Sequence, residues 1–215
     1  MKVYGLVLLL YTLRSGMSSF SQDKIEGIGR FTIGKATVSI VQEIATETGI
    51  PVEFVDSGTK IEKLAKSQIV EIKSNPNVGK ALRTSINSPL CAHVSVFYIN
   101  NYREADIDLK SVYLFFEDDV LVKFTCYASS QLNTALELKY GEPEVEIIKL
   151  YSDCNLDAKS FILTWANGSI AATLSLLVSY DDNCQKRVSQ AFNIALKGKE
   201  NQIAPCAGIV KARDK

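Results

Sequence analysis

The stretch KSVYLFFEDDVLVKFTCYASSQLNTALELKYGEP, residues 110–143, decides most of what the sequence predicts about the fold. Its first part places apolar side chains on both faces of an alternating pattern, which predicts a strand in the centre of a sheet. Glu117, Asp118 and Asp119 predict a polar turn. Residues 120–125 alternate again and predict the returning strand of a hairpin.

A helix is predicted directly after this hairpin. Ser129 or Ser130 can cap its N-terminus, and the apolar residues that follow have helical spacing: Leu132, Ala135, Leu136 and Tyr140. Gly141 suits a left-handed position just past the last turn. Pro143 prevents the helix from continuing.

The remainder of the chain predicts one more helix and several strands. The helix covers residues 37–48 and stops at Gly49, while residues 188–196 fit either a strand or a helix. A second hairpin is predicted around Asn167-Gly168, and strands are predicted at 51–55, 68–73, 91–99, 104–110, 144–150, 161–165 and 170–180. We therefore expect an α+β protein with a mainly antiparallel sheet and two principal helices packed on one side.

Length and composition are those of a globular protein. The chain has 215 residues, 47% of them hydrophobic, which is enough for one buried core. Lys and Arg together number 24, as do Asp and Glu, and no basic stripe with interleaved aromatic residues is present. The sequence therefore argues against a nucleic-acid partner. After the first 21 residues we expect one domain, 22–215, or two similar halves, 22–100 and 101–215.

The N-terminus has the pattern of a secretory signal peptide. Lys2 precedes an apolar run at residues 3–13, which is too short for a stable membrane anchor. Small residues at Ser19 and Ser21 predict cleavage before Gln22. We therefore expect a signal peptide at 1–21, export to the periplasm or the extracellular space, and no stable membrane insertion after cleavage.

Export would place the five cysteines in an oxidising compartment, where disulfides form. No CxxC pair is present, so zinc binding and thioredoxin-like chemistry have little support. Cys91 and Cys126 lie in strand-like sequence and can be small buried apolar residues. Cys154, Cys184 and Cys206 lie in polar loop contexts and are the better candidates for disulfides, with a connectivity that the sequence leaves open.

Catalytic candidates are few. Cys91 and His93, the only histidine, would lie on one face of a strand, and Asp106 and Asp108 would form a pair of carboxylates. Packing explains the first pair and a solvated strand face explains the second more simply. We assign no catalytic, metal-binding or cofactor-binding residue, and we keep a secreted hydrolase acting on glycan or peptide as the alternative function.

The leading expectation is an exported, non-catalytic protein that binds a protein, a peptide or an envelope component. Exposed sheet edges or an aromatic-lined groove would provide the means. Tyr98, Tyr102 and Arg103 are the candidate contact patch, because two aromatic side chains and a guanidinium group fall close together in the sequence.

The helix end Lys139-Tyr140-Gly141-Glu142-Pro143 and the turn Trp165-Ala166-Asn167-Gly168 resemble features of small exported proteins of unknown function from Bacteroidetes-type bacteria. The resemblance covers residues 110–180 and implies an exported α+β protein. The segment Phe31-Thr-Ile-Gly34-Lys35 is also faintly similar to the start of small envelope modules related to outer-membrane assembly lipoproteins and β-lactamase-inhibitor-like folds. Neither resemblance implies catalytic residues.

Overall fold

A computed structural model describes residues 24–56, 68–73, 93–152, 154 and 156–199 of the chain. The signal peptide predicted at 1–21 lies outside these residues, as do Cys91 and Cys206. Strands account for 58% and helices for 15% of the described chain.

One nine-stranded mixed sheet dominates the structure, in the spatial order β3-β4-β5-β6-β7-β11-β10-β9-β8. β3 and β4 are parallel, and each of the other neighbouring pairs is antiparallel. A separate two-stranded sheet is formed by β1 (Gly27–Ile28) and β2 (Phe31–Thr32). The strands of the large sheet are β3 (Val52–Asp56), β4 (Ile69–Lys73), β5 (Val94–Glu104), β6 (Ile107–Glu117), β7 (Val120–Tyr127), β8 (Glu144–Leu150), β9 (Ala158–Asn167), β10 (Ile170–Tyr180) and β11 (Lys186–Leu196).

The predicted fold class, α+β with a mainly antiparallel sheet and two helices packed on one side, is wrong. The described part of the protein is mostly β, with a mixed sheet and two helices of 10 and 11 residues. Two features explain the error. β5, β6, β7 and β9 are longer than the local patterns predicted, and residues 188–196, which fitted either state, lie in a strand between two others. Pairing with β7 and β10 decided what local propensity could not.

The two helices contribute to one buried cluster. α2 (Ser39–Thr48) supplies Ile40, Val41 and Ile44, and it ends at the predicted Gly49, which has a left-handed conformation. α4 (Ser130–Tyr140) begins as predicted, with the Ser129 hydroxyl accepting a hydrogen bond from the Leu132 N–H. At its other end the backbone differs from the prediction, because Gly141 has a positive φ of 79° but an extended ψ of −166°.

The second predicted hairpin is present, but its turn is shifted by one residue. Asn167 pairs with Ile170, so the two-residue turn is Gly168-Ser169 rather than Asn167-Gly168. Gly168 has a φ of 53°, whereas Asn167 remains in the strand. Glycine in the first turn position with positive φ is typical of a type II′ turn, which matches the twist of the flanking strands.

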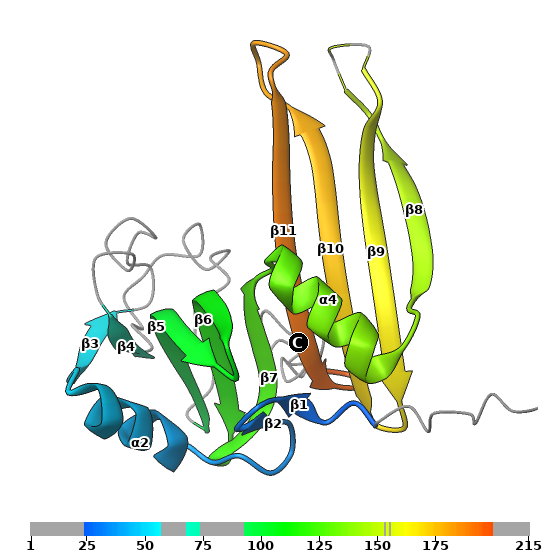
Figure 1. Cartoon of the computed structure of the whole chain (residues 1–215). Helices are drawn as coiled ribbons and strands as arrows, with labels where there is room; N and C mark the ends of the chain where they lie inside the picture. The colour runs from blue at the N-terminus through cyan, green and yellow to red at the C-terminus, as the bar shows by residue number, and fades with distance from the viewer. Residues whose placement is uncertain (1–23, 57–67, 74–92, 153, 155, 200–215) are drawn as a thin grey trace, which may run out of the picture.

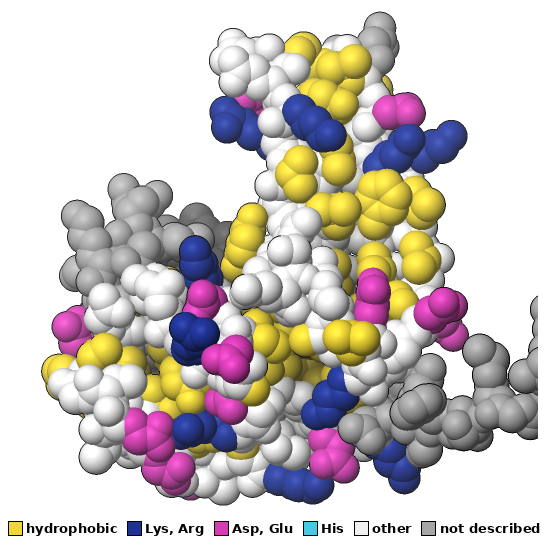
Figure 2. Space-filling view, in the orientation of Figure 1, with side chains coloured by type: hydrophobic (Ala, Val, Ile, Leu, Met, Phe, Trp, Pro, Cys, Tyr) yellow, Lys and Arg dark blue, Asp and Glu magenta, His cyan; other side chains and the backbone are white. Residues whose placement is uncertain are grey.

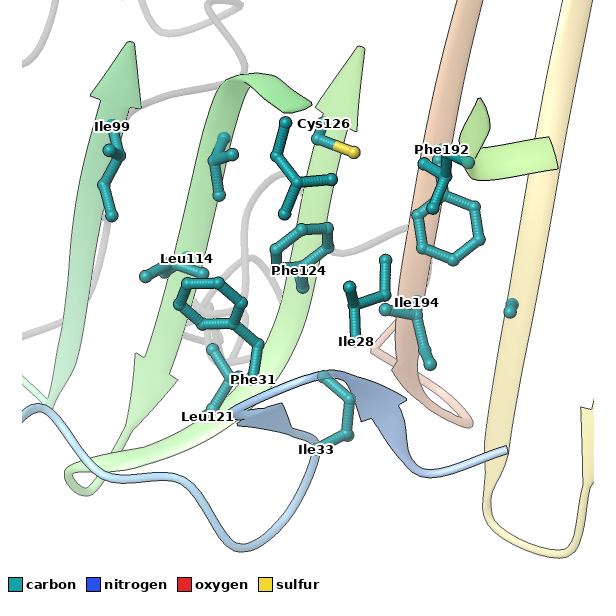
Figure 3. Close-up of a cluster of buried hydrophobic side chains, with 14 of the residues drawn as sticks. Ile28, Phe31, Ile33, Ile99, Leu114, Leu121, Phe124, Cys126, Phe192 and Ile194 are labelled. Carbon is teal, nitrogen blue, oxygen red and sulfur yellow. The ribbon is translucent and has the colours of Figure 1, made fainter. Parts of the chain in front are cut away.

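The buried cluster spans the junction between β7 and β11 (Figure 3). Phe124 of β7 lies with its ring centroid 6.3 Å from that of Phe192 on β11. Phe31 of the small sheet packs on the other side of Phe124, at a centroid distance of 5.3 Å. The small sheet therefore seals the place where the two parts of the large sheet meet.

Two long-range hydrogen bonds fix the C-terminal end of α4. The Tyr140 hydroxyl donates to the Gly27 carbonyl at 2.8 Å in a buried position. The Trp165 indole N–H donates to the Gly141 carbonyl, also at 2.8 Å. Trp165 is itself buried. These bonds tie α4 to both the small sheet and β9.

We expect Tyr140→Phe to lower the free energy of unfolding by about 1–2 kcal/mol, because the buried Gly27 carbonyl would lose its donor. Urea denaturation measures this change. Tyr127→Phe is the control, since Tyr127 is half exposed at a strand end. An equal effect of the two substitutions would contradict the role given to the Tyr140 hydrogen bond.

Cys126 is buried, as predicted, and burial raises the pKa of its thiol to about 12. In the unfolded chain this thiol ionises near pH 9, so the unfolded state loses its proton first as the pH rises. We therefore expect the free energy of unfolding to fall as the pH rises from 9 toward 12. Cys126→Ala should remove the part of this fall that begins below pH 10.

Peptide mapping after iodoacetamide treatment at pH 8 should find Cys126 unmodified in the folded protein.

Candidate functional site

The outer ends of four strands extend beyond the rest of the molecule (Figure 1). We call the region formed by β8, β9, β10 and β11 the projecting sheet. Its lower part is covered by α4, which crosses it on one face. We call this face, and its continuation past the helix, the front face.

The upper front face is apolar and uncovered. The strand register places Ile147 beside Phe161, Phe161 beside Leu176, and Val178 beside Val188. Directly paired residues in an antiparallel sheet lie on the same face, so these side chains form continuous rows. Figure 2 shows hydrophobic side chains gathered over these strands. The apolar residues that lie outside both buried clusters are Val145, Ile147, Phe161, Leu176, Val178, Tyr180 and Val188.

Exposure distinguishes this face from an ordinary core. The exposed fractions of Val145, Ile147 and Val188 are 59%, 58% and 50%. Phe161 and Leu176 are only half-buried, although they lie on the two middle strands of the projecting sheet. Isolated exposed apolar residues are common, but a contiguous group of them marks an interaction surface more often than chance.

The two faces of the projecting sheet differ in their acidic residues. Lys149 and Lys159 lie on the front face in the same row as Val178 and Val188, and Lys186 lies there beside Tyr180. Lys159 also pairs with Asp157 at 3.0 Å. The acidic residues of β8, Glu144 and Glu146, lie on the back face. The front face of the four strands carries no Asp or Glu in this described region.

The back face is more polar in its middle strands. Ser160, Thr173, Ser175 and Ser179 alternate there with apolar residues. This agrees with the predicted alternation of residues 170–180, in which one face is more polar than the other. The front face is therefore the more continuous apolar surface of the two for a partner to contact.

A disulfide joins the loop of the β8–β9 hairpin to the loop of the β10–β11 hairpin. Cys154, in the loop between β8 and β9, bonds to Cys184, in the loop between β10 and β11, with the Cα atoms 5.6 Å apart. This confirms that two of the predicted loop cysteines form a bridge. Asp181 supports the same loop by accepting hydrogen bonds from the Gln185 N–H and from the Arg187 guanidinium group. Those bonds, the first above all, lower the pKa of Asp181.

The predicted contact patch is not assembled on one exposed surface. Tyr98 is buried in the smaller cluster, and its hydroxyl bonds to Asn100. Tyr102 packs against the main cluster instead, and its hydroxyl donates to Glu104. Burial, and then the Glu104 carboxylate, raise the pKa of Tyr102 to about 12. Arg103 is exposed and pairs with Asp106.

Residues weighed for catalysis are dispersed. Asp106 lies in the tight turn between β5 and β6 with a side chain 94% exposed, and Asp108 follows on the solvated start of β6. His93 lies 3.6 Å from Glu117, which also pairs with Lys199. None of these residues lines the surface hollows beside Trp165, beside Cys154 and Cys184, or beside Gly49. Within the same residues, no group of three or more His, Cys, Asp or Glu could hold a metal ion.

Sequence reasoning did not find the projecting sheet. β8, β9 and β10 were predicted as strands, whereas β11 was left open between a strand and a helix. A local signal was present in β8, where apolar residues occur on both faces. That signal usually indicates a central strand. Only the spatial order of the strands reveals that β8 lies at the outer edge.

In the part of the chain that the structure describes, no helix has both the length and the apolar character needed to cross a membrane. Comparison with known proteins adds no further identification: no family model, no curated protein sequence and no solved structure matches this chain. The resemblance to small exported bacterial proteins therefore stays a prediction.

Proposed function

We propose that the chain is an exported, non-catalytic binding protein. Its ligand would be a protein or peptide segment that presents apolar side chains next to Asp or Glu. The observation that carries this proposal is the front face of the projecting sheet, which is apolar, exposed and bordered by lysines.

The lower half of the same face indicates how the upper half can be covered. There α4 packs its buried side chains, Leu132 and Leu136, against a cluster that includes Leu174 and Phe192. Farther out, the rows continue with Phe161 and Leu176 but no described element covers them. A second amphipathic segment would fit this surface chemically, and burying the apolar rows would supply most of its affinity.

The charges on the front face indicate which ligand charge the surface would attract. Lys149 and Lys186 border the apolar rows, and the front face of these strands offers no carboxylate to a ligand. An acidic segment would therefore be attracted, whereas a basic one would be repelled. Because the lysines lie at the exposed rim, this contribution should weaken as salt is added.

The disulfide supports the export part of the proposal. A bridge between Cys154 and Cys184 fits an oxidising compartment, such as the periplasm or the extracellular space. The predicted signal peptide points the same way. The partner would then be another exported protein or a protein component of the envelope.

The test uses two amphipathic peptides of about five helical turns. They share the same leucines, and one carries Glu and the other Lys on the polar face. We expect fluorescence anisotropy to detect binding of the Glu peptide, with an affinity that falls between about 50 and 300 mM salt. The double variant Lys149→Glu, Lys186→Glu should weaken binding by roughly tenfold.

The control is Lys35→Glu combined with Lys110→Glu, which makes the same charge change outside the projecting sheet. It should leave the affinity within about twofold. Equal binding of both peptides, or an equal effect of both double variants, would contradict the proposal. Failure of both peptides to bind, together with binding to vesicles of anionic phospholipid, would identify a lipid surface instead.

A further inference from the structure

β8 is the last strand of the large sheet, and no described residue pairs with its outer edge (Figure 1). All seven of its residues are exposed. Four of them are large aliphatic residues: Val145, Ile147, Ile148 and Leu150, with exposed fractions of 59%, 58%, 39% and 39%. An edge strand of this kind offers free backbone N–H and C=O groups together with apolar side chains.

Few of the usual protective devices are present on this strand. It contains no proline and no irregularity in its pairing with β9. Its only charges are Glu144 and Glu146 near one end and Lys149 near the other. Long, regular and apolar edges pair readily with another strand, and natural proteins that remain monomeric usually block them.

We propose that β8 pairs with β8 of a second copy of the chain, antiparallel and about a two-fold axis at Ile147. This inference goes beyond the proposed function and does not rest on it, because it concerns the free backbone edge of β8, although Val145 and Ile147 also belong to the front face. The pairing would join the two nine-stranded sheets edge to edge into one continuous sheet of 18 strands, with the two projecting sheets at its centre.

The register follows from the sequence of β8. A two-fold axis at Ile147 opposes Ile147 to its own copy and uses the full length of the strand. The two residues of every pair are an even number of positions apart in the sequence. Their side chains therefore lie on the same face of the joined sheet. The remaining pairs would be Glu144 with Leu150, Val145 with Lys149, and Glu146 with Ile148, each residue meeting the partner's copy.

The charges of β8 favour this arrangement over its alternatives. With the axis at Ile147, no like charges lie directly opposite each other. Moving the axis to Glu146 would oppose two carboxylates and would shorten the pairing. A parallel arrangement in register would oppose Glu144, Glu146 and Lys149 to themselves, and such pairs are destabilising. Moving the axis to Ile148 avoids like charges but loses pairs at one end of the strand.

Sedimentation velocity with the folded protein tests the proposal. We expect a dimer, and we expect Ile147→Lys to raise its dissociation constant by at least about tenfold. In this variant two ammonium groups would meet at the axis. The matched control is Val188→Lys, which alters a residue of similar exposure on the front face of β11, away from the edge. It should leave the dimer intact while weakening the peptide binding proposed above.

A second readout keeps the test independent of folding defects. Cysteine in place of Ile147 should form an intermolecular disulfide under mild oxidation, because directly opposed residues of antiparallel strands are close enough to bridge. The same replacement at Val188 should not. A monomer at all concentrations, equal disruption by Ile147→Lys and Val188→Lys, or no specific bridge at position 147 would each overturn the proposal. Unchanged circular dichroism of both lysine variants is required for the comparison.

Discussion

The short pairing between β7 and β11 holds the structure together. Only five residue pairs join these strands, from Ala191 with Tyr127 to Ala195 with Lys123. Within the described residues, it is this strand pairing, the seam of the sheet, that joins the projecting sheet to the remaining strands of the large sheet. Its stability therefore depends less on the pairing itself than on the rings of Phe31, Phe124 and Phe192, which pack across it. The small sheet of β1 and β2 contributes to this stability because it positions Phe31 at the junction of β7 and β11.

This arrangement separates two roles within one sheet. On one side of the seam, β3 to β7 and α2 form an ordinary covered core. On the other side, the strands continue past α4 and expose both of their faces. A sheet that is exposed on both faces gains little from burial, so it must be supported from its base. Trp165 and Tyr140 provide this support through hydrogen bonds that hold α4 against the base.

Local patterns predicted the individual elements well. The alternation in residues 110–125 gave β6 and β7, and Ser129 and Gly49 marked the ends of helices correctly. The spatial order of the strands could not be predicted, because the pairing of β7 with β11 joins residues far apart in the sequence. The residues of the candidate contact patch are separated for a related reason. Tyr98 and Tyr102, an even number of residues apart, pack in different clusters, so regular alternation is interrupted between them.

The Cys154–Cys184 bridge has a consequence for how the protein responds to mechanical or proteolytic stress. β9 and β10 are joined at one end by the turn at Gly168 and are enclosed at the other end by the bridge, so they form a covalent ring. Strands normally separate first at their free ends. Here the disulfide holds β9 and β10 together at the end most distant from the core. Their separation would therefore have to begin at the end nearest the core. A single cut in the backbone inside the ring would release no fragment while the bridge is oxidised.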